Sequence, residues 1–487
     1  MYQSIKQLGY HSFVYGLGNM LSKLLGFFLL PIYTRYLTPA DYGILALLTL
    51  TQSILVILAN LGLSSALFRE VIYKKTDEKK AESTALYTLL IISLFMLAIG
   101  YIFAPLLSRA IFNDVAQTPL LRLVFLNVVF NNILIVFNAR LRIREQSLFY
   151  SIFSVSSFLV GAGLNIYFVA IARRGVEGLI LAQVLLAALQ AFVCLLMLRD
   201  LIKPDFSKPV LRSLLNFGLP LVPGAIAALI LVSADRYILN KFSTTTMVGL
   251  YSLGYSIGMV INLIVQAVQL AWPAQLFEIA KFPDAKQRLS MTLTYYCLAL
   301  GFISLAVSVL AREILVIMTT PEYYGAYIIM PLITLSYVFY GIRFMTTIGM
   351  YIKNKVKYSS FVIIGAAIFN LVLSFLLIPR FGMIGAAWAT FVSYFLLAVV
   401  NIMVDSRFMQ IPYEYWRLTK IMAIWLLMFG LSLLISTPST WINLILKTIW
   451  LMSYPLLLFI VRFYNHQEIQ FIKDFLTHKV LRANSHS

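Results

Sequence analysis

Long apolar runs, separated by short polar segments, recur from one end of the chain to the other. Each run holds about 20 residues, which is the length an α-helix needs to cross the hydrocarbon core of a bilayer. The apolar residues within each run are continuous, which favours helices over strands of alternating character. We therefore predict an all-α polytopic membrane protein with about 14 transmembrane helices, centred near residues 23, 52, 93, 128, 158, 188, 225, 260, 301, 337, 367, 393, 428 and 452.

The distribution of charge predicts how these helices are oriented. Charged residues make up 12% of the chain, and its net charge is +19. Most of the 38 lysines and arginines lie in the two tails and in loops 64–82, 139–147, 199–213, 277–290, 351–358 and 405–420. Cytoplasmic loops are enriched in lysine and arginine, so we predict that both termini are cytoplasmic. The positive charge then reflects membrane topology, and no nucleic acid is expected as a partner.

An internal repeat divides the predicted helices into groups. RYLTPADYGILALL (35–48) aligns with KFSTTTMVGLYSLG (241–254), which places Gly43 opposite Gly249. RRGVEG (173–178) aligns with PRFGMIG (379–385) at a similar offset. We predict two six-helix repeats, 1–205 and 206–410, followed by two further helices and a basic cytoplasmic tail in 411–487. An even number of helices per repeat gives both halves the same orientation, related by a pseudo-two-fold axis along the membrane normal.

Three segments carry a resemblance to a known family. PIYTRYLTPADYG (31–43) resembles the first-hairpin signature of the polysaccharide biosynthesis (O-antigen-type) flippases. SADRYIL (233–239) and AWPAQLFEIA (271–280) resemble segments of the second half of those proteins. The flippases belong to the multidrug/oligosaccharidyl-lipid/polysaccharide exporter superfamily, and the arrangement of six, six and two helices is similar to theirs.

The resemblance implies a function and a location. It implies a transporter that flips a polyprenyl-(di)phosphate-linked oligosaccharide from the cytoplasmic to the outer leaflet, by alternating access between the two halves. The product would serve the synthesis of a surface polysaccharide, such as lipopolysaccharide O-antigen, capsule or exopolysaccharide, and the protein would lie in the inner (cytoplasmic) cell membrane. A polysaccharide polymerase or other assembly protein is a possible partner. The alternative is an ion-coupled multidrug or cation antiporter of the same superfamily.

Basic residues in or near the predicted spans are candidates for binding the phosphate of such a substrate. Charges within a membrane usually face the interior of the bundle or a wet cavity. LSKLLGF (21–27) resembles the first span of lipid II flippases, in which a basic residue lines the central cavity, and Lys23 matches that position. An ion pair or snorkelling to the interface is the alternative for Lys23, and interfacial anchoring is the alternative for Arg35. Arg69 and Arg343 are further candidates.

Neutral polar residues and carboxylates complete the candidate site. Asn262, Gln266 and Gln269 recur at four and three residues, which places them on one face of a helix, where they suit the hydroxyls of a sugar. The chain contains no G-x-x-x-x-G-K-[ST] phosphate-binding motif, so we expect an ion gradient, the membrane potential or the downstream consumption of product to drive transport. Asp235 and Glu278 are the candidate carriers of a coupling ion, with a structural ion pair as the alternative for Asp235.

A third class of function is a membrane enzyme that acts on lipid-linked sugars. Membrane glycosyltransferases and polymerases need carboxylates presented on a sizeable outer loop. The predicted outer loops are short and the sequence contains no D-x-D motif. We therefore expect no catalytic residues, no cofactor and no metal site.

Overall fold

The computed structural model is helical throughout the residues that it describes, which are 27, 29–201, 205–353, 355, 357–465 and 468–470. Within them it contains no β-strand. Ten helical segments are long and apolar enough to cross a membrane, or eleven if one bent pair counts as a single span. The prediction of an all-α multi-pass membrane protein is thereby confirmed.

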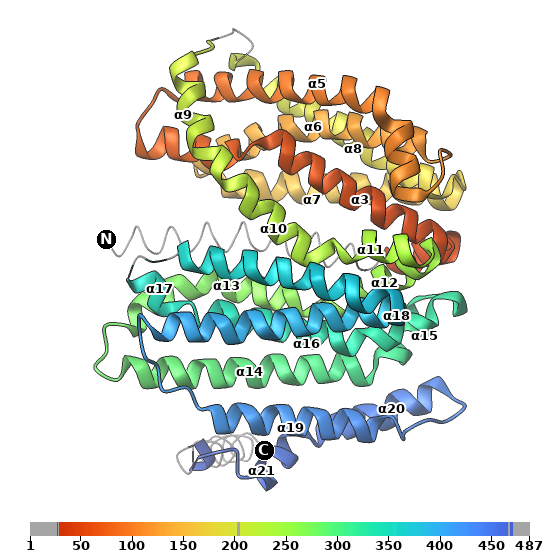
Figure 1. Ribbon diagram of the computed structural model, residues 1–487, viewed down its shortest axis with the longest axis vertical. Helices are drawn as coiled ribbons and strands as arrows, with labels where there is room; N and C mark the ends of the chain where they lie inside the picture. The colour runs from red at the N-terminus through yellow and green to blue at the C-terminus, as the bar shows by residue number, and fades with distance from the viewer. Residues whose placement is uncertain are drawn as a thin grey trace, which may run out of the picture.

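The helices form two stacked lobes and a peripheral group (Figure 1). The first lobe, at the top of Figure 1, contains α3 (Pro39–Asn60), α4 (Leu63–Phe68), η1 (Arg69–Tyr73), α5 (Glu78–Phe112), α6 (Thr118–Ile143), α7 (Ser147–Ile166), η2 (Tyr167–Ile171), α8 (Gly175–Met197), η3 (Arg199–Leu201) and the linking helix α9 (Lys208–Gly218). The second lobe begins after η4 (Leu219–Leu221) and contains α10 (Val222–Ser233), α11 (Asp235–Phe242), α12 (Thr245–Gly258), α13 (Ile261–Ile279), α14 (Ala285–Val309), α15 (Ala311–Met318), η5 (Pro321–Ile329), α16 (Met330–Met345), α17 (Ile348–Ile352) and α18 (Lys357–Ser406). The peripheral group contains α19 (Tyr415–Ser432), α20 (Thr440–Met452) and α21 (Tyr454–Ile460).

The two ends of the bundle differ in charge. The basic end holds the beginnings of α9 and α14 together with α17, on the left of Figure 1, and contains the loops rich in lysine and arginine. The opposite end holds α11, α15 and the segment that precedes α20.

The long element α18 is a helical hairpin. Gly382, near its middle, adopts φ 55° and ψ −133°, which interrupts the helix. This backbone conformation favours glycine because it has no Cβ. Tyr358 near the start of α18 and Val404 near its end line the same groove, so the two arms lie side by side. One helical element therefore accounts for the two spans predicted near residues 367 and 393.

Three other departures explain why fewer spans are found than were predicted. The span predicted near residue 23 lies outside the described residues, apart from its end in α2 (Leu30–Tyr36). The span predicted near residue 260 is a bent pair, α12 and α13, with an angle of 49° at the break. In addition, α19 carries Arg417 and Lys420 in its first two turns, and it is not among the helices that are apolar enough to cross a membrane.

The start of α3 is a helix cap. Thr38 accepts a hydrogen bond from the Asp41 N–H, and the Asp41 carboxylate accepts one from the Thr38 N–H at 3.0 Å. Pro39 occupies the first turn, where its missing N–H costs nothing. The LTPADYG stretch thus fixes where α3 begins, and it places Gly43 one turn into the helix.

The lobes cross closely between α3 and α12, near the opposite end. A Cβ added to Gly43 would lie 2.0 Å from the Thr245 carbonyl oxygen, and one added to Gly249 would lie 1.8 Å from the Pro39 carbonyl oxygen. Only glycine permits this approach of the two backbones. The glycines aligned by the predicted repeat therefore meet at a single crossing.

Hydrogen bonds between the lobes lie near the same crossing. The Thr51 and Tyr237 hydroxyls are 2.7 Å apart, and the Asn240 amide donates to the Ile111 carbonyl at 2.6 Å. The Tyr323 hydroxyl of η5 donates to the carbonyl of Leu37, just after α2, at 2.8 Å. The lobes are thus joined by both backbone packing and polar contacts at the opposite end.

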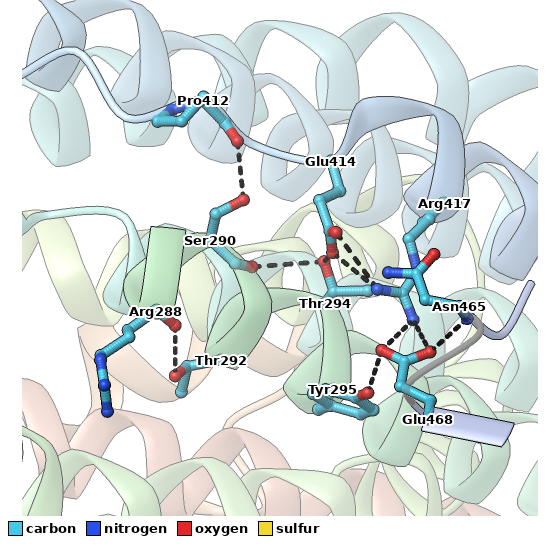
Figure 2. A network of polar contacts seen from close by, with 10 residues as sticks. All are labelled: Arg288, Ser290, Thr292, Thr294, Tyr295, Pro412, Glu414, Arg417, Asn465 and Glu468. Atoms are coloured by element: carbon cyan, nitrogen blue, oxygen red, sulfur yellow. Dashed lines mark hydrogen bonds and ion pairs between the residues drawn. The ribbon is translucent and has the colours of Figure 1, made fainter. Parts of the chain in front are cut away.

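A polar network fastens the peripheral group to the second lobe at the basic end (Figure 2). Arg417 of α19 forms ion pairs with Glu414 and Glu468, each at 3.1 Å. Thr294 of α14 donates to Glu414 at 2.7 Å, and Tyr295 donates to Glu468. Burial alone would raise the pKa of Glu468, but the Tyr295 and Asn465 hydrogen bonds and the Arg417 charge hold it below its ordinary value.

The glycine crossing generates a prediction about stability. Gly249→Ala places a methyl group where a backbone oxygen now lies, and overpacking of this kind typically costs about 1–3 kcal/mol. We expect the melting temperature of the purified protein in detergent to fall by several degrees. Gly365→Ala in α18 is the matched control, because nothing lies within 4 Å of a Cβ at that position. Equal melting temperatures for the two variants would contradict the crossing.

Candidate functional site

A polar cavity lies between the lobes, next to the α3–α12 crossing. Its volume is about 240 Å³. The two lobes both contribute to its lining, which consists of Tyr42, Leu45, Ala46, Thr49, Leu50 and Ser53 from α3 and Ser233, Arg236, Ser252 and Ser256 from α10, α11 and α12. We call this space the interlobe cavity.

The crossing determines which residues reach the interlobe cavity. Ser252 and Ser256 follow Gly249 at three and seven residues, on the same face of α12. Ala46 and Ser53 follow Gly43 at three and ten residues on α3. Small and polar residues therefore continue along both helices from the point of contact toward the basic end. The interlobe cavity lies beside these residues, next to the crossing.

Arg236 is the charged residue of the lining. It is 9% exposed, and its guanidinium lies 4.5 Å from the Tyr255 ring centroid and 5.7 Å from that of Tyr251. One nitrogen, Nη1, donates to the Val232 carbonyl at 3.1 Å and lies 3.3 Å from Asp235 Oδ1. Aromatic faces stabilise a cation without neutralising it, so Arg236 presents positive charge to the cavity.

Asp235 lies behind Arg236, away from the lining. It is 2% exposed, and its Oδ2 accepts hydrogen bonds from the Tyr251 hydroxyl and, at 3.4 Å, from Thr390 of α18. The ion pair with Arg236 that was the structural alternative for Asp235 is present. A carboxylate held on the α18 side and a guanidinium on the cavity side leave the cavity face positive.

Hydroxyl groups supply the remaining polarity of the cavity. Ser256 donates to the Ser252 carbonyl at 2.8 Å, and Ser53 donates to the Thr49 carbonyl at 2.9 Å. Each of these oxygens can still accept a hydrogen bond from a ligand. The Ser252 hydroxyl is buried without a hydrogen-bond partner among the described residues. The lining can thus bind an anion at Arg236 and hydroxyl groups around it.

Three of the four basic residues selected from the sequence are described, and they lie in different places. Lys23 lies outside the described residues. Arg35 is exposed in the last turn of α2. Arg69, at the start of η1, is half-buried with its guanidinium 4.6 Å from the Phe217 ring centroid. Arg343 is buried and donates from Nη2 to the Ser359 hydroxyl at 2.6 Å.

The polar face expected on one helix lies on α13. Asn262, Gln266 and Gln269 are all half-buried there. The Asn262 side-chain oxygen is buried and has no hydrogen-bond partner within the described part of the chain. The lining of the interlobe cavity consists of other residues, so the structure does not bring this face together with Arg236.

The two candidate coupling carboxylates have opposite surroundings. Asp235 is buried in the second lobe, against Arg236. The Glu278 side chain is 64% exposed at the end of α13 and pairs with Lys281 at 2.7 Å.

Arg236 is the residue that selection from the sequence misses. Its place at the end of an apolar span favours interfacial anchoring instead. A usable signal is present, since Tyr251 and Tyr255 recur at four residues and Ser252 and Ser256 alternate with them. What the sequence does not reveal is the packing of α11 against α12 and α18, which buries Arg236 in the bundle.

Comparison with known proteins places this geometry in context. The family model for polysaccharide biosynthesis proteins matches residues 32–274, about half of the chain. Lsg locus putative protein 1 of Haemophilus influenzae is 26% identical over 285 residues, which cover 55% of this chain and 66% of that protein. An uncharacterised membrane protein of Methanocaldococcus jannaschii is 24% identical over 220 residues, covering 43% of this chain and 42% of that protein. The chain thus spans less than two thirds of the length of either relative.

Two solved structures share the fold along most of their length. The lipid II flippase MurJ, in an inward closed conformation, gives a TM-score of 0.64 at 16% identity and covers 92% of this chain and 98% of its own. An inward-facing multidrug resistance MATE family transporter of the MOP superfamily gives 0.57 at 14% identity, covering 85% and 96%. The fold of this chain is therefore that of these membrane transporters. The family match shows that the chain belongs to the polysaccharide biosynthesis protein family.

Proposed function

We propose that the protein flips a polyprenyl-(di)phosphate-linked oligosaccharide from the cytoplasmic to the outer leaflet, for the synthesis of a surface polysaccharide. The observation that carries the proposal is the position of Arg236, a buried cation between the lobes with hydroxyl groups around it. The family membership and the shared fold support the same class of function.

The chemistry of the cavity suits the obstacle that such a substrate faces. A buried hydroxyl without a hydrogen-bond partner costs roughly 1–3 kcal/mol on protein scales, and an oligosaccharide has many. Arg236 offsets the phosphate charge, while the serine and threonine oxygens of α3 and α12 accept hydrogen bonds from sugar hydroxyls. An oligosaccharide is larger than a cavity of about 240 Å³. Binding therefore requires the lobes to separate further, and the tail remains in the lipid.

The helix arrangement that goes with this mechanism has 14 spans. Repeats 1–205 and 206–410 are related by a pseudo-two-fold axis along the membrane normal, and 411–487 adds two spans and a tail. The meeting of Gly43 with the α12 backbone and of Gly249 with the α3 backbone supports such an axis, since it would bring equivalent positions together. The two arms of α18 count as two of the spans.

The basic end of the bundle indicates how the protein is oriented in the membrane. Lysine-rich and arginine-rich loops at that end support a cytoplasmic position for it and for both termini, in the inner membrane. The interlobe cavity then lies on the side of the α3–α12 crossing that faces the cytoplasm, where the substrate is made. Lys23, Arg35, Arg69 and Arg343 are proposed as additional contacts for the phosphate, and Asn262, Gln266 and Gln269 as contacts for the sugar as the lobes move.

Coupling to an ion gradient is assigned to Asp235 rather than to Glu278. Asp235 is buried between α11, α12 and α18, and a change in its protonation or cation binding would alter its bond to Arg236. Glu278 already has an exposed partner in Lys281. The exposed pair is screened by water and contributes little.

A drug or cation antiporter is the second candidate, favoured by the buried Asp235 and by the fold shared with MATE transporters. A cationic substrate needs an acidic lining. Here Arg236 stands between Asp235 and the cavity, so the positive lining favours an anionic substrate.

Replacement of Arg236 tests the proposed substrate site. In a strain whose native gene is replaced, Arg236→Ala should reduce surface polysaccharide at least about tenfold, since removal of one partner of a buried charge interaction costs about 2–5 kcal/mol. The lipid-linked precursor should accumulate on the cytoplasmic leaflet. Arg236→Lys should retain part of the activity because it keeps the charge. Arg380→Ala, at an exposed arginine outside the cavity, is the control, with membrane expression verified for each variant. Normal polymer with Arg236→Ala would remove this residue from the site.

Replacement of the two carboxylates tests the assignment of coupling. In proteoliposomes with an imposed ion gradient, Asp235→Asn should abolish the acceleration by the gradient, because the neutral amide cannot exchange a proton or hold a cation. Glu278→Gln should leave the acceleration unchanged, since its carboxylate is exposed. Loss of the gradient effect with Glu278→Gln alone would reverse the assignment.

A further inference from the structure

Two adjoining cavities lie between the second lobe and the peripheral group, near the opposite end of the bundle. Their volumes are about 330 Å³ and 170 Å³. Arg312, Glu313 and Asn443 line both of them. The larger is within the range of roughly 300–1,000 Å³ that small-molecule sites occupy. We call the pair the peripheral site, because α20 lies at the edge of the molecule, beyond the second lobe from α3 (Figure 1).

A buried ion pair forms the floor of the peripheral site. Lys447 Nζ of α20 donates to Glu313 Oε1 of α15 at 2.7 Å. Glu313 is 2% exposed and Lys447 is 9% exposed. The second carboxylate oxygen, Oε2, is buried and has no hydrogen-bond partner among the described residues. A buried carboxylate oxygen normally accepts a hydrogen bond. A ligand that enters the adjacent cavity can supply the donor.

Arg312 supplies an uncommitted cation at the same site. Its side chain is exposed and lines both cavities, and no hydrogen bond or ion pair to it is found within the described part of the chain. Lys447 already neutralises Glu313. The site therefore has one positive charge in excess, which belongs to Arg312.

The wall formed by α20 is fixed and is surrounded by lipid-facing residues. The Asn443 side chain accepts from the Thr437 N–H at 2.7 Å and donates to the Thr437 carbonyl at 2.9 Å. Trp441, in the first turn of α20, is 66% exposed, and Leu434 in the preceding segment is 80% exposed. Exposed tryptophan at a helix end is typical of the level of lipid head groups. The peripheral site thus opens where a head group would lie.

We propose that the peripheral site binds the head group of an anionic glycerophospholipid that carries free hydroxyls, as phosphatidylglycerol does. The phosphodiester accepts hydrogen bonds from Arg312, and a glycerol hydroxyl donates to Glu313 Oε2. A neutral donor suits Oε2 better than an ammonium group, because Lys447 already places one cation on this carboxylate. The bound lipid would join α15 to α20. This proposal does not depend on the transported substrate.

Native mass spectrometry of the purified, delipidated full chain tests the proposal. Phosphatidylglycerol, phosphatidylethanolamine and phosphatidylcholine with identical acyl chains are added in equal amounts. We expect phosphatidylglycerol to bind about tenfold more tightly than the other two, the effect of about one charge-assisted hydrogen bond. Arg312→Gln should reduce it to the level of phosphatidylcholine. Arg380→Gln, which changes an exposed arginine outside the site, should leave the preference unchanged.

A second variant separates binding from folding. Glu313→Gln keeps a carbonyl oxygen for Lys447 but weakens the acceptor that faces the cavity, so the preference for phosphatidylglycerol over phosphatidylmethanol, a lipid of equal charge without glycerol hydroxyls, should fall several-fold. Melting temperatures of all variants are recorded beside the binding data. Equal binding of the three lipids to the unchanged protein, or an undiminished preference in Arg312→Gln, would overturn the proposal. Tightest binding of phosphatidylethanolamine would overturn the choice of a neutral donor.

Discussion

The backbone contact between α3 and α12 is the constraint on which the rest of the molecule depends. Two glycines allow the helices to approach until the neighbouring carbonyl oxygens occupy the places where Cβ atoms would otherwise be. In lipid, apolar side chains gain little from leaving one apolar environment for another, so close packing of this kind is a main source of helix association. The interlobe cavity lies along the same two helices, beside this contact, so the crossing determines which α3 and α12 side chains line it.

The charge in the cavity is held by the same part of the structure. Arg236 follows Asp235 at the start of α11, and the short turn at Ala234 separates them from the apolar helix α10. The carboxylate is bound on the α18 side by Tyr251 and Thr390, while the guanidinium lies against Tyr255. Burying one charge without the other would be strongly unfavourable. The pair can therefore remain inside the bundle while only its cationic half contacts the cavity.

Sequence patterns predicted the class of fold well and the site less well. Continuous apolar runs require helices in a bilayer, and Gly43 and Gly249 were already aligned by the repeat. The hairpin within α18 was predicted as two spans, although a single residue, Gly382, makes the turn. Arg236 was not selected from the sequence because position along a span does not reveal which neighbouring helices the end of that span packs against. The polar face of α13 was correctly placed on one helix, but the face that a helix directs toward a cavity depends on tertiary packing.

The peripheral group shows how helices outside the two lobes are held in a membrane. Its α20 presents Trp441, Ile445 and Ile449 to the surroundings, each more than half exposed, so apolar contact alone would not distinguish the second lobe from lipid. Charged pairs make the surface of the second lobe different from lipid for this group. Arg417 forms such pairs near one end of the group and Lys447 near the other. Lys447 pairs directly with Glu313 of the second lobe, whereas the carboxylates that pair with Arg417 accept hydrogen bonds from Thr294 and Tyr295 of α14. Position is therefore specified by the cost of leaving a buried charge unpaired, and apolar packing then fills the space between the two anchors.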